Sequence, residues 1–259
     1  MKNLILIVVS CSLLWAVTAV SKPTIETVER SFTVAEGGTL FIENDAGAIG
    51  IESHSRATVD IEVTIKGDDL EDYTLKFSED DNNVFVVGER NGSGFWNNGP
   101  NASFKIKVPE HYNIKSRTGG GSFSLTSLRG DVDTYTSGGS IKLSKVIGNA
   151  KVKTSGGSIR VEEIEGNINA HTSGGSIKAT LSKQLTEDSA LTTSGGSVTV
   201  YLPSSVEIDL IASTSGGRVR SDFDVNGTIK KKSIKGTING GGPELKLRTS
   251  GGSVSIIKL

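Results

Sequence analysis

The sequence predicts an all-β protein that folds as a single-stranded parallel β-solenoid, a stack of coils of 18–21 residues. The first observation is a repeated turn, TSGGS or a close variant. Its threonines are Thr118, Thr136, Thr154, Thr172, Thr193, Thr214 and Thr249. Successive copies are separated by 18, 18, 18, 21, 21 and 35 residues. A short period that tolerates insertions is typical of a solenoid, so we expect each coil to stack on the one before it.

The second observation is the alternation of apolar residues on both sides of each turn. Ile159 and Val161 lie five and seven residues after Thr154, and Ala150 and Val152 lie four and two residues before it. Most other copies have apolar residues at the same offsets. This pattern predicts two β-strands per coil, with every second residue inward. We expect the Gly-Gly pair to turn the chain between them, because glycine adopts positive φ without Cβ strain.

The N-terminal half follows the same rule less regularly. In LFIENDAGAIGIES, apolar residues flank Asn44 at the offsets seen around each threonine, which predicts an eighth, degenerate corner. ATVDIEVTIKG and SFKIKVP alternate as strands. The segment between them, about 66–103, is expected to add a hairpin and a polar loop. The predicted solenoid domain covers residues 22–259, with irregular coils first and regular coils over about 104–259.

The chain begins with a predicted signal peptide, residues 1–19. Lys2 precedes an apolar run that ends in small residues, and cleavage is expected after residue 19 or 21. The run is shorter than the ~20 apolar residues of a spanning helix. We therefore expect an exported protein without a membrane span in its mature form, periplasmic, at the cell surface or secreted. Lipidation of Cys11, the only cysteine, is the alternative that the sequence leaves open.

Composition and turn chemistry limit the partners. The chain has 28 basic and 29 acidic residues, for a net charge of −1, whereas nucleic-acid binding needs a basic excess. A calcium-binding β-roll has Asp after its Gly-Gly turn, but here Ser-Ile-Lys, Ser-Ile-Arg or Ser-Val-Thr follows. We expect no nucleic acid, no cofactor and no metal.

A polysaccharide-active β-helix enzyme is the alternative of a different class, and it needs carboxylates that converge on one bond. The acidic candidates are Asp131 and Asp133 on one strand face, and Glu162, Glu163 and Glu165 in one coil. Neighbouring coils do not repeat them. The histidines lie far apart in the repeat, at His54, His111 and His171. We therefore predict no catalytic residue.

Residues at one outward-facing position of successive coils provide the candidate ligand contacts, and they form a column along the solenoid. Six residues after the corner threonines stand Ser124, Lys142, Arg160, Lys178, Thr199 and Arg220. Like charges on adjacent strands repel, so the ridge of Lys142, Arg160 and Lys178 suggests either contact with an anionic glycan or protection of the surface. Phe95 and Trp96 form the second candidate, either to stack a sugar or to pack on the solenoid. The corner threonines could suggest ice binding, but apolar neighbours favour hydrogen bonds to the corner backbone.

Residues 30–259 resemble a bacterial family of adhesin-like domains of unknown function. The resemblance rests on NDAGAIGIES, KIKVPEHYNIKSRTGGGSFSL, the TSGGS copies and GGGPELKLRTSGGSVSI. It implies a right-handed parallel β-solenoid that is secreted or surface-exposed, and it implies little chemistry. We predict a non-enzymatic structural or interaction protein that contacts an envelope component, a glycan or a protein, through one solenoid face. A scaffold subunit that stacks through its edge strands is a further alternative.

Overall fold

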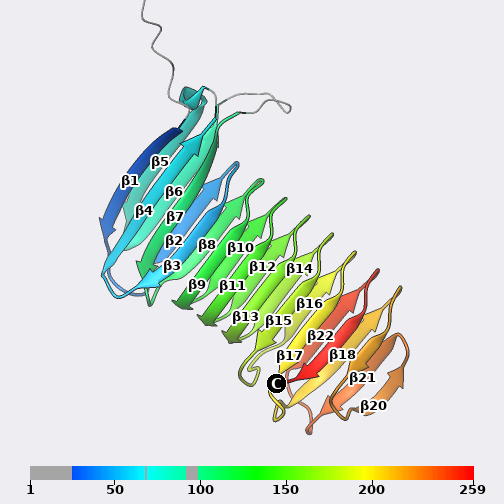
Figure 1. Ribbon diagram of the computed structural model, residues 1–259. Helices are drawn as coiled ribbons and strands as arrows, with labels where there is room; N and C mark the ends of the chain where they lie inside the picture. Colours follow the sequence, from blue (N-terminus) through cyan, green and yellow to red (C-terminus); the bar gives the residue numbers. More distant parts are fainter. Residues whose placement is uncertain (1–24, 68, 92–98) are drawn as a thin grey trace, which may run out of the picture.

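The computed structural model describes residues 25–67, 69–91 and 99–259. The predicted signal peptide, residues 1–19, and the Phe95–Trp96 pair lie outside these ranges. The described residues form two long β-sheets, called sheet A and sheet B, that face each other along an elongated stack of coils (Figure 1).

The spatial order of the strands in each sheet differs from their order in the sequence. From one edge to the other, sheet A contains β1 (Ile25–Thr33), β4 (Thr58–Lys66), β7 (Asn101–Pro109), β3 (Ile49–His54), β9 (Phe123–Arg129), β11 (Ile141–Ile147), β13 (Ile159–Glu165), β15 (Ile177–Leu181), β17 (Val198–Leu202), β23 (Val254–Lys258) and β19 (Val219–Ser221). Sheet B contains β20 (Asn226–Lys230), β21 (Ser233–Ile238), β18 (Ile208–Thr214), β22 (Glu244–Thr249), β16 (Ser189–Thr193), β14 (Ile168–Thr172), β12 (Ala150–Thr154), β10 (Val132–Thr136), β8 (Asn113–Thr118), β2 (Thr39–Asn44), β6 (Asn83–Arg90) and β5 (Tyr73–Asp80). A short 3-10 helix, η1 (Leu70–Asp72), precedes β5.

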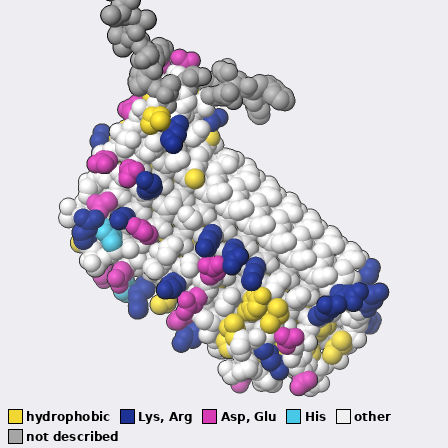
Figure 2. Space-filling model, viewed as in Figure 1, with side chains coloured by type: hydrophobic (Ala, Val, Ile, Leu, Met, Phe, Trp, Pro, Cys, Tyr) yellow, Lys and Arg dark blue, Asp and Glu magenta, His cyan; other side chains and the backbone are white. Residues whose placement is uncertain are grey.

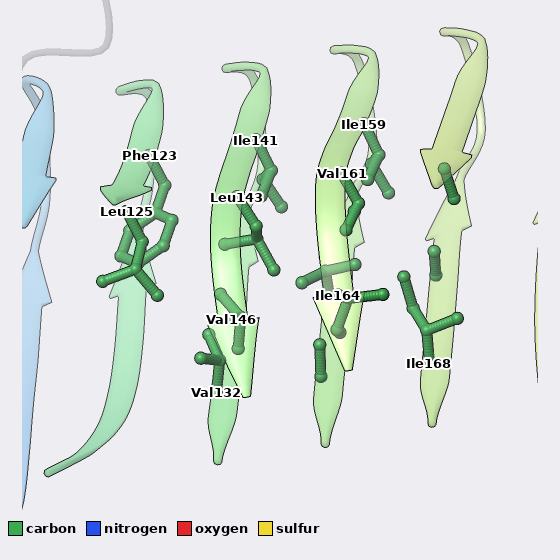
Figure 3. Close-up of a cluster of buried hydrophobic side chains, with 14 of the residues drawn as sticks. Phe123, Leu125, Val132, Ile141, Leu143, Val146, Ile159, Val161, Ile164 and Ile168 are labelled. Carbon is green, nitrogen blue, oxygen red and sulfur yellow. The ribbon is translucent and has the colours of Figure 1, made fainter. Parts of the chain in front are cut away.

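Each regular coil contributes one strand to each sheet, and its TSGGS corner joins the two. The corner threonines lie side by side, since Thr136 pairs with Thr118 on one side and with Thr154 on the other. Alternate residues of both sheets are buried between them, and Figure 3 shows Ile141 and Ile159 at equivalent places in neighbouring coils. The predicted β-solenoid and its inward columns are confirmed.

The second glycine of each TSGGS corner is needed for a reason that the repeat pattern alone does not reveal. No glycine of the TSGGS corners has positive φ, so that expectation is wrong. A Cβ on Gly157 would lie 2.1 Å from the carbonyl oxygen of Gly139 in the preceding coil. The backbones of successive coils approach too closely for any side chain at this position. Positive φ occurs at the opposite corner instead, at Gly130, Gly148 and Gly166.

The corner threonine bonds to two coils at once. Oγ1 of Thr154 donates to the carbonyl oxygen of Gly139 at 2.7 Å and accepts from the backbone N–H of Gly157 at 3.3 Å. The same bond to a neighbouring coil is made by Thr136, Thr172, Thr193, Thr214 and Thr249. These side chains are buried and satisfy backbone groups that water does not reach. They are not available at the surface for an ice-binding ladder.

The last coil does not stack in sequence order. β22 lies between β16 and β18, and β23 lies between β17 and β19. The expectation that every coil stacks on its predecessor is therefore wrong at this end. The reason is the β20–β21 hairpin, because β21 pairs antiparallel with the outer edge of β18 and closes that edge. The chain then returns to the inner edge, and this detour occupies most of the 35-residue spacing.

The N-terminal end adds two irregular coils. β2 and β3 pair in parallel with β8 and β9, with Asn44 beside Thr118, so the predicted degenerate corner is confirmed. β6 and β7 form the next coil, in which Gly88 lies beside Asn44. The hydroxyl of Tyr73 occupies the space above Gly88 and donates to Oδ1 of Asn44. Antiparallel pairing of β5, β4 and β1 then closes this end.

Candidate functional site

The cationic ridge, defined as Lys142, Arg160 and Lys178, lies in one row on the outer face of sheet A. Strand register places Arg160 directly beside both of the others. The inward neighbours of these residues are buried, so the three side chains point to solvent, and those of Lys142 and Arg160 are 55% and 57% exposed. Figure 2 shows a short row of basic side chains across the middle of the solenoid. The structure thus brings together the three cations that the repeat predicted to be neighbours.

Glu162 relieves the repulsion within the cationic ridge. Its carboxylate lies 3.4 Å from Nζ of Lys142 and accepts a hydrogen bond from Nε of Arg160 at 2.6 Å. The bond from Arg160, followed by the bond and charge of Lys142, holds the pKa of Glu162 below its usual range. Sequence reasoning had placed Glu162 only in an acidic edge. The strand alternation could have found it, because it lies two residues after Arg160 on the same face.

Lys178 lies at one end of the cationic ridge, next to Arg160. Its Nζ lies 4.9 Å from the centre of the Tyr201 ring, which is within the range of a cation–π contact. Tyr201 pairs in register with Thr180 of the neighbouring coil. With Arg160, Glu162 and Lys178 these two residues line a shallow hollow of about 230 Å³. The hollow therefore offers cations, a hydroxyl and an aromatic ring on one surface.

The outward column is interrupted beyond the cationic ridge. The sequence order placed Arg220 directly after Thr199, but Ser255 of the returning strand β23 lies between them. Ser124 lies on the other side of Lys142. The ridge is thus three coils long, with uncharged residues at both ends.

The acidic residues weighed as catalytic candidates do not all lie on one face of the solenoid. Oδ1 of Asp131 accepts a hydrogen bond from the backbone N–H of Asn149 at 2.9 Å. Asp133 forms an ion pair with Lys151 at 3.4 Å. Both belong to the sheet B side of the solenoid, whereas Glu162 lies on the outer face of sheet A. A general acid and base need to flank one bond, and the pair of Asp131 and Asp133 lies on the face opposite to Glu162.

A cluster near the N-terminal end contains the residue types of a hydrolase triad in a different arrangement. Oγ of Ser31 donates to Asp60 at 2.7 Å rather than to a histidine. Arg56 bonds to Asp60 at 2.6 Å and to Nδ1 of His54 at 3.1 Å. Nε2 of His54 lies 2.8 Å from the carbonyl oxygen of Thr58. With both ring nitrogens engaged, His54 has no free nitrogen to activate the serine, and the cluster fastens β1 to β4.

Metal-binding clusters and membrane-spanning helices are both absent from the described ranges. The described residues contain no group of three or more His, Cys, Asp and Glu side chains that could hold a metal ion. Nor does that part of the chain contain a helix long and apolar enough to cross a membrane.

Known proteins give one family match and several structural similarities. No curated protein matches the chain. Similar solved structures include a candidate cell adhesion protein from Clostridium sporogenes (16% identity, 90% of this chain and 100% of that one, TM-score 0.37), a candidate adhesin from Bacteroides fragilis (13%, 90% and 97%, 0.40) and a candidate lipid-binding protein from Parabacteroides distasonis (17%, 89% and 96%, 0.43). Residues 131–257 match the model of the family described as Toastrack DUF4097. The resemblance to a domain family found from the motifs is thereby confirmed over residues 131–257, which are similar to the Toastrack DUF4097 family.

Proposed function

We propose that this protein is an exported, non-enzymatic binding module that holds an anionic polymer of the cell envelope against the outer face of sheet A. The observation that carries the proposal is the cationic ridge, in direct register on three coils, with the ring of Tyr201 beside Lys178. The predicted signal peptide at residues 1–19 supports export. The closely packed coils support a rigid surface, because each corner is fixed to the next by threonine hydrogen bonds.

The spacing of the cationic ridge suits a linear ligand. Adjacent strands lie ~4.8 Å apart, so the three cations extend over roughly two strand spacings along the solenoid axis. A polymer lying along this axis would meet them in sequence. Because the side chains are exposed, each contact is weak and sensitive to salt. Affinity would then come from summed contacts along the polymer.

The rival function, a polysaccharide-active enzyme, is less well supported at this surface. Glu162 is the carboxylate in the hollow beside Tyr201, and a general acid there would need a raised pKa. The bond from Arg160 lowers the pKa of Glu162 instead. Glu162 is therefore ionised at neutral pH and would act as an electrostatic partner of the two cations.

The test measures binding of polygalacturonate by calorimetry at low salt. Replacement of Lys142, Arg160 and Lys178 by Gln is expected to weaken binding about tenfold. Each exposed ion pair is worth about 0.5 kcal/mol, and 1.4 kcal/mol corresponds to a factor of ten. Glu162→Gln is expected to strengthen binding, because it releases Lys142 and Arg160 from their shared carboxylate.

The matched control changes the same amount of charge elsewhere. Lys230, Lys231 and Lys235 are exposed residues of the β20–β21 hairpin, and their replacement by Gln should leave binding nearly unchanged. An equal loss in both triple variants would mean that only net charge matters. That result, or wild-type protein that binds no polyanion at low salt, would overturn the proposed function.

A further inference from the structure

The outer face of sheet B carries a second set of cations that no single repeated column of the sequence reveals. Two outward columns run along it, three residues and one residue before the corner threonines. In the first, Lys115 of β8 lies beside Asp133 of β10, which lies beside Lys151 of β12. In the second, the order is Arg117, Tyr135 and Lys153. Each column therefore has a cation on β8 and another on β12, and the coil between them carries a different side chain.

Aromatic rings lie among these cations. Nζ of Lys115 is 5.2 Å from the centre of the Phe41 ring, and Nζ of Lys153 is 6.0 Å from that of Tyr135. Phe41 also stacks on Phe85 of β6, with ring centres 4.7 Å apart and planes 7° apart. The three rings are only partly buried. The face therefore presents flat apolar surfaces next to positive charges.

All of these side chains except that of Phe85 line one shallow hollow of about 570 Å³. It contains four cations, Lys115, Arg117, Lys151 and Lys153, and two carboxylates, those of Glu43 and Asp133. Asp133 pairs with Lys151 at 3.4 Å. No described acidic residue forms an ion pair with Arg117 or Lys153, in contrast to Lys142 and Arg160 on sheet A, which share Glu162. The hollow keeps an excess of positive charge.

We propose that this hollow binds a linear acidic polysaccharide whose sugars carry a carboxylate on every second unit. The proposal rests on the proposed function for the class of ligand, an anionic polymer, but it assigns a different face and a defined repeat. A pyranose unit in an extended chain is about as long as one strand spacing, ~4.8 Å. A polymer lying along the axis therefore places one sugar over each coil.

The alternation of side chains sets the repeat of the ligand. Carboxylates on alternate sugars meet Arg117 and Lys153, while the uncharged sugar between them lies over the ring of Tyr135. The C–H face of a sugar packs on an aromatic ring as other apolar groups do. A polymer with a carboxylate on every sugar would bring one against Asp133 or Tyr135. The like-charge contact with Asp133 disfavours the wrong ligand.

The experiment compares three oligosaccharides of equal length by calorimetry at low salt. They are hyaluronan, with alternating carboxylates, polygalacturonate, with a carboxylate on every sugar, and a neutral chitin oligomer. The wild type is expected to bind hyaluronan several-fold more tightly than polygalacturonate, and the chitin oligomer weakest. Arg117→Gln with Lys153→Gln should weaken hyaluronan binding about tenfold, and Tyr135→Ala by a similar factor.

Two matched variants separate this site from the cationic ridge. Tyr201→Ala removes a tyrosine that also lies beside a lysine, but on sheet A, and should weaken hyaluronan binding less than Tyr135→Ala does. The Gln variant of the cationic ridge should likewise weaken it less than the double variant of Arg117 and Lys153. Loss of hyaluronan binding in the ridge variants but not in the Arg117, Lys153 and Tyr135 variants would overturn this inference while leaving the proposed function intact. Equal affinity of the cationic-ridge Gln variant for the two charged oligosaccharides would also overturn it. Unchanged melting temperatures confirm that the variants are folded.

Discussion

The regular coils and the two ends of the solenoid use different pairings to build the same core. In the regular coils, a strand pairs with the equivalent strand of the next repeat, as Val132 does with Ala150. At the C-terminal end, Ser189 pairs with Leu245, and strands β17 to β21 lie between these two residues along the chain. At the N-terminal end, Thr39 pairs with Asn113, which is also distant in the sequence. The repeat thus encodes the middle of the stack. The ends need long-range and antiparallel strands, because an open sheet edge would pair with other chains.

The difference in pairing predicts a difference in tolerance to deletion. Removal of residues 150–167 takes out one regular coil and leaves Asn149 joined to Ile168, in the same register as the natural junction of Asn167 with Ile168. We expect this variant to fold. Removal of residues 243–259 takes out β22 and β23, on which both β16–β17 and β18–β19 depend.

The second deletion is expected to have the largest effect on stability. It removes four buried hydrophobic side chains, those of Leu245, Leu247, Val254 and Ile256. At ~1.5–3 kcal/mol each, their burial amounts to on the order of 6–12 kcal/mol. Hydrogen exchange should show protection lost over residues 204–242 and retained over 113–181. Equal destabilisation by the two deletions would contradict the contrast between the middle and the ends.

The sequence predicts the middle of the fold better than its ends for a physical reason. The positions of the apolar residues relative to each corner threonine determine which residues face inward. They also predict how the strands of neighbouring regular coils align, and that Asn44 takes the place of a corner threonine. The last coil has the same pattern as the others, so nothing in its own residues indicates that it lies between two earlier coils. Only the 35-residue spacing before Thr249 indicated an unusual connection.

The candidate site shows the same limit. The repeat places Lys142, Arg160 and Lys178 in one row, because their spacing equals one coil. The partners of these residues depend on rotamers and on the second outward position of each strand, which carries Glu162 and Tyr201. The sheet B hollow was missed since its rows combine cations, aromatic rings and an acid, and no single residue type repeats. Close backbone approach at Gly157 is likewise a property of stacked coils.

The threonine bonds provide a smaller test of the same comparison. Thr154→Val preserves shape but leaves the carbonyl oxygen of Gly139 and the N–H of Gly157 without their partner, which should lower stability by about 1–3 kcal/mol. Thr118→Val should lower it by less. The bond from Thr118 to the oxygen of Gly47 is long, at 3.5 Å, and Asn44 also donates to this oxygen at 3.2 Å.

The measurement is the urea midpoint of each threonine variant. Thr172→Val serves as a second regular-coil variant, because Thr172 makes the same two bonds as Thr154. A larger loss for Thr118→Val than for these two would mean that the corner bonds matter most at the boundary with the irregular coils, contrary to the expectation.

The smallest expected effect on stability comes from the ionisation of buried tyrosines at alkaline pH. Tyr112 lies in the N-terminal part, and burial, assisted by the charge of Glu79, raises its pKa to about 12. Burial also raises the pKa of Tyr73, with a contribution from Asp45. In the regular coils, hydrogen bonds from Ser137 and then Ser155 lower the pKa of the exposed Tyr135.

These shifts predict that alkaline pH weakens the N-terminal end first. An unfolded tyrosine has a pKa of about 10, below the folded value of Tyr112. The stability that its protonated form contributes is therefore fully present below pH 10 and is lost as the pH rises toward 12.

Tyr112→Phe loses the bond to the carbonyl oxygen of Asn82, which should lower stability at neutral pH by about 1 kcal/mol. It should also flatten the pH dependence between 10 and 12, measured as urea midpoints. Tyr135→Phe, the control in a regular coil, should keep the wild-type slope over this range. A Tyr112→Phe variant with an unchanged slope would show that the alkaline transition begins elsewhere.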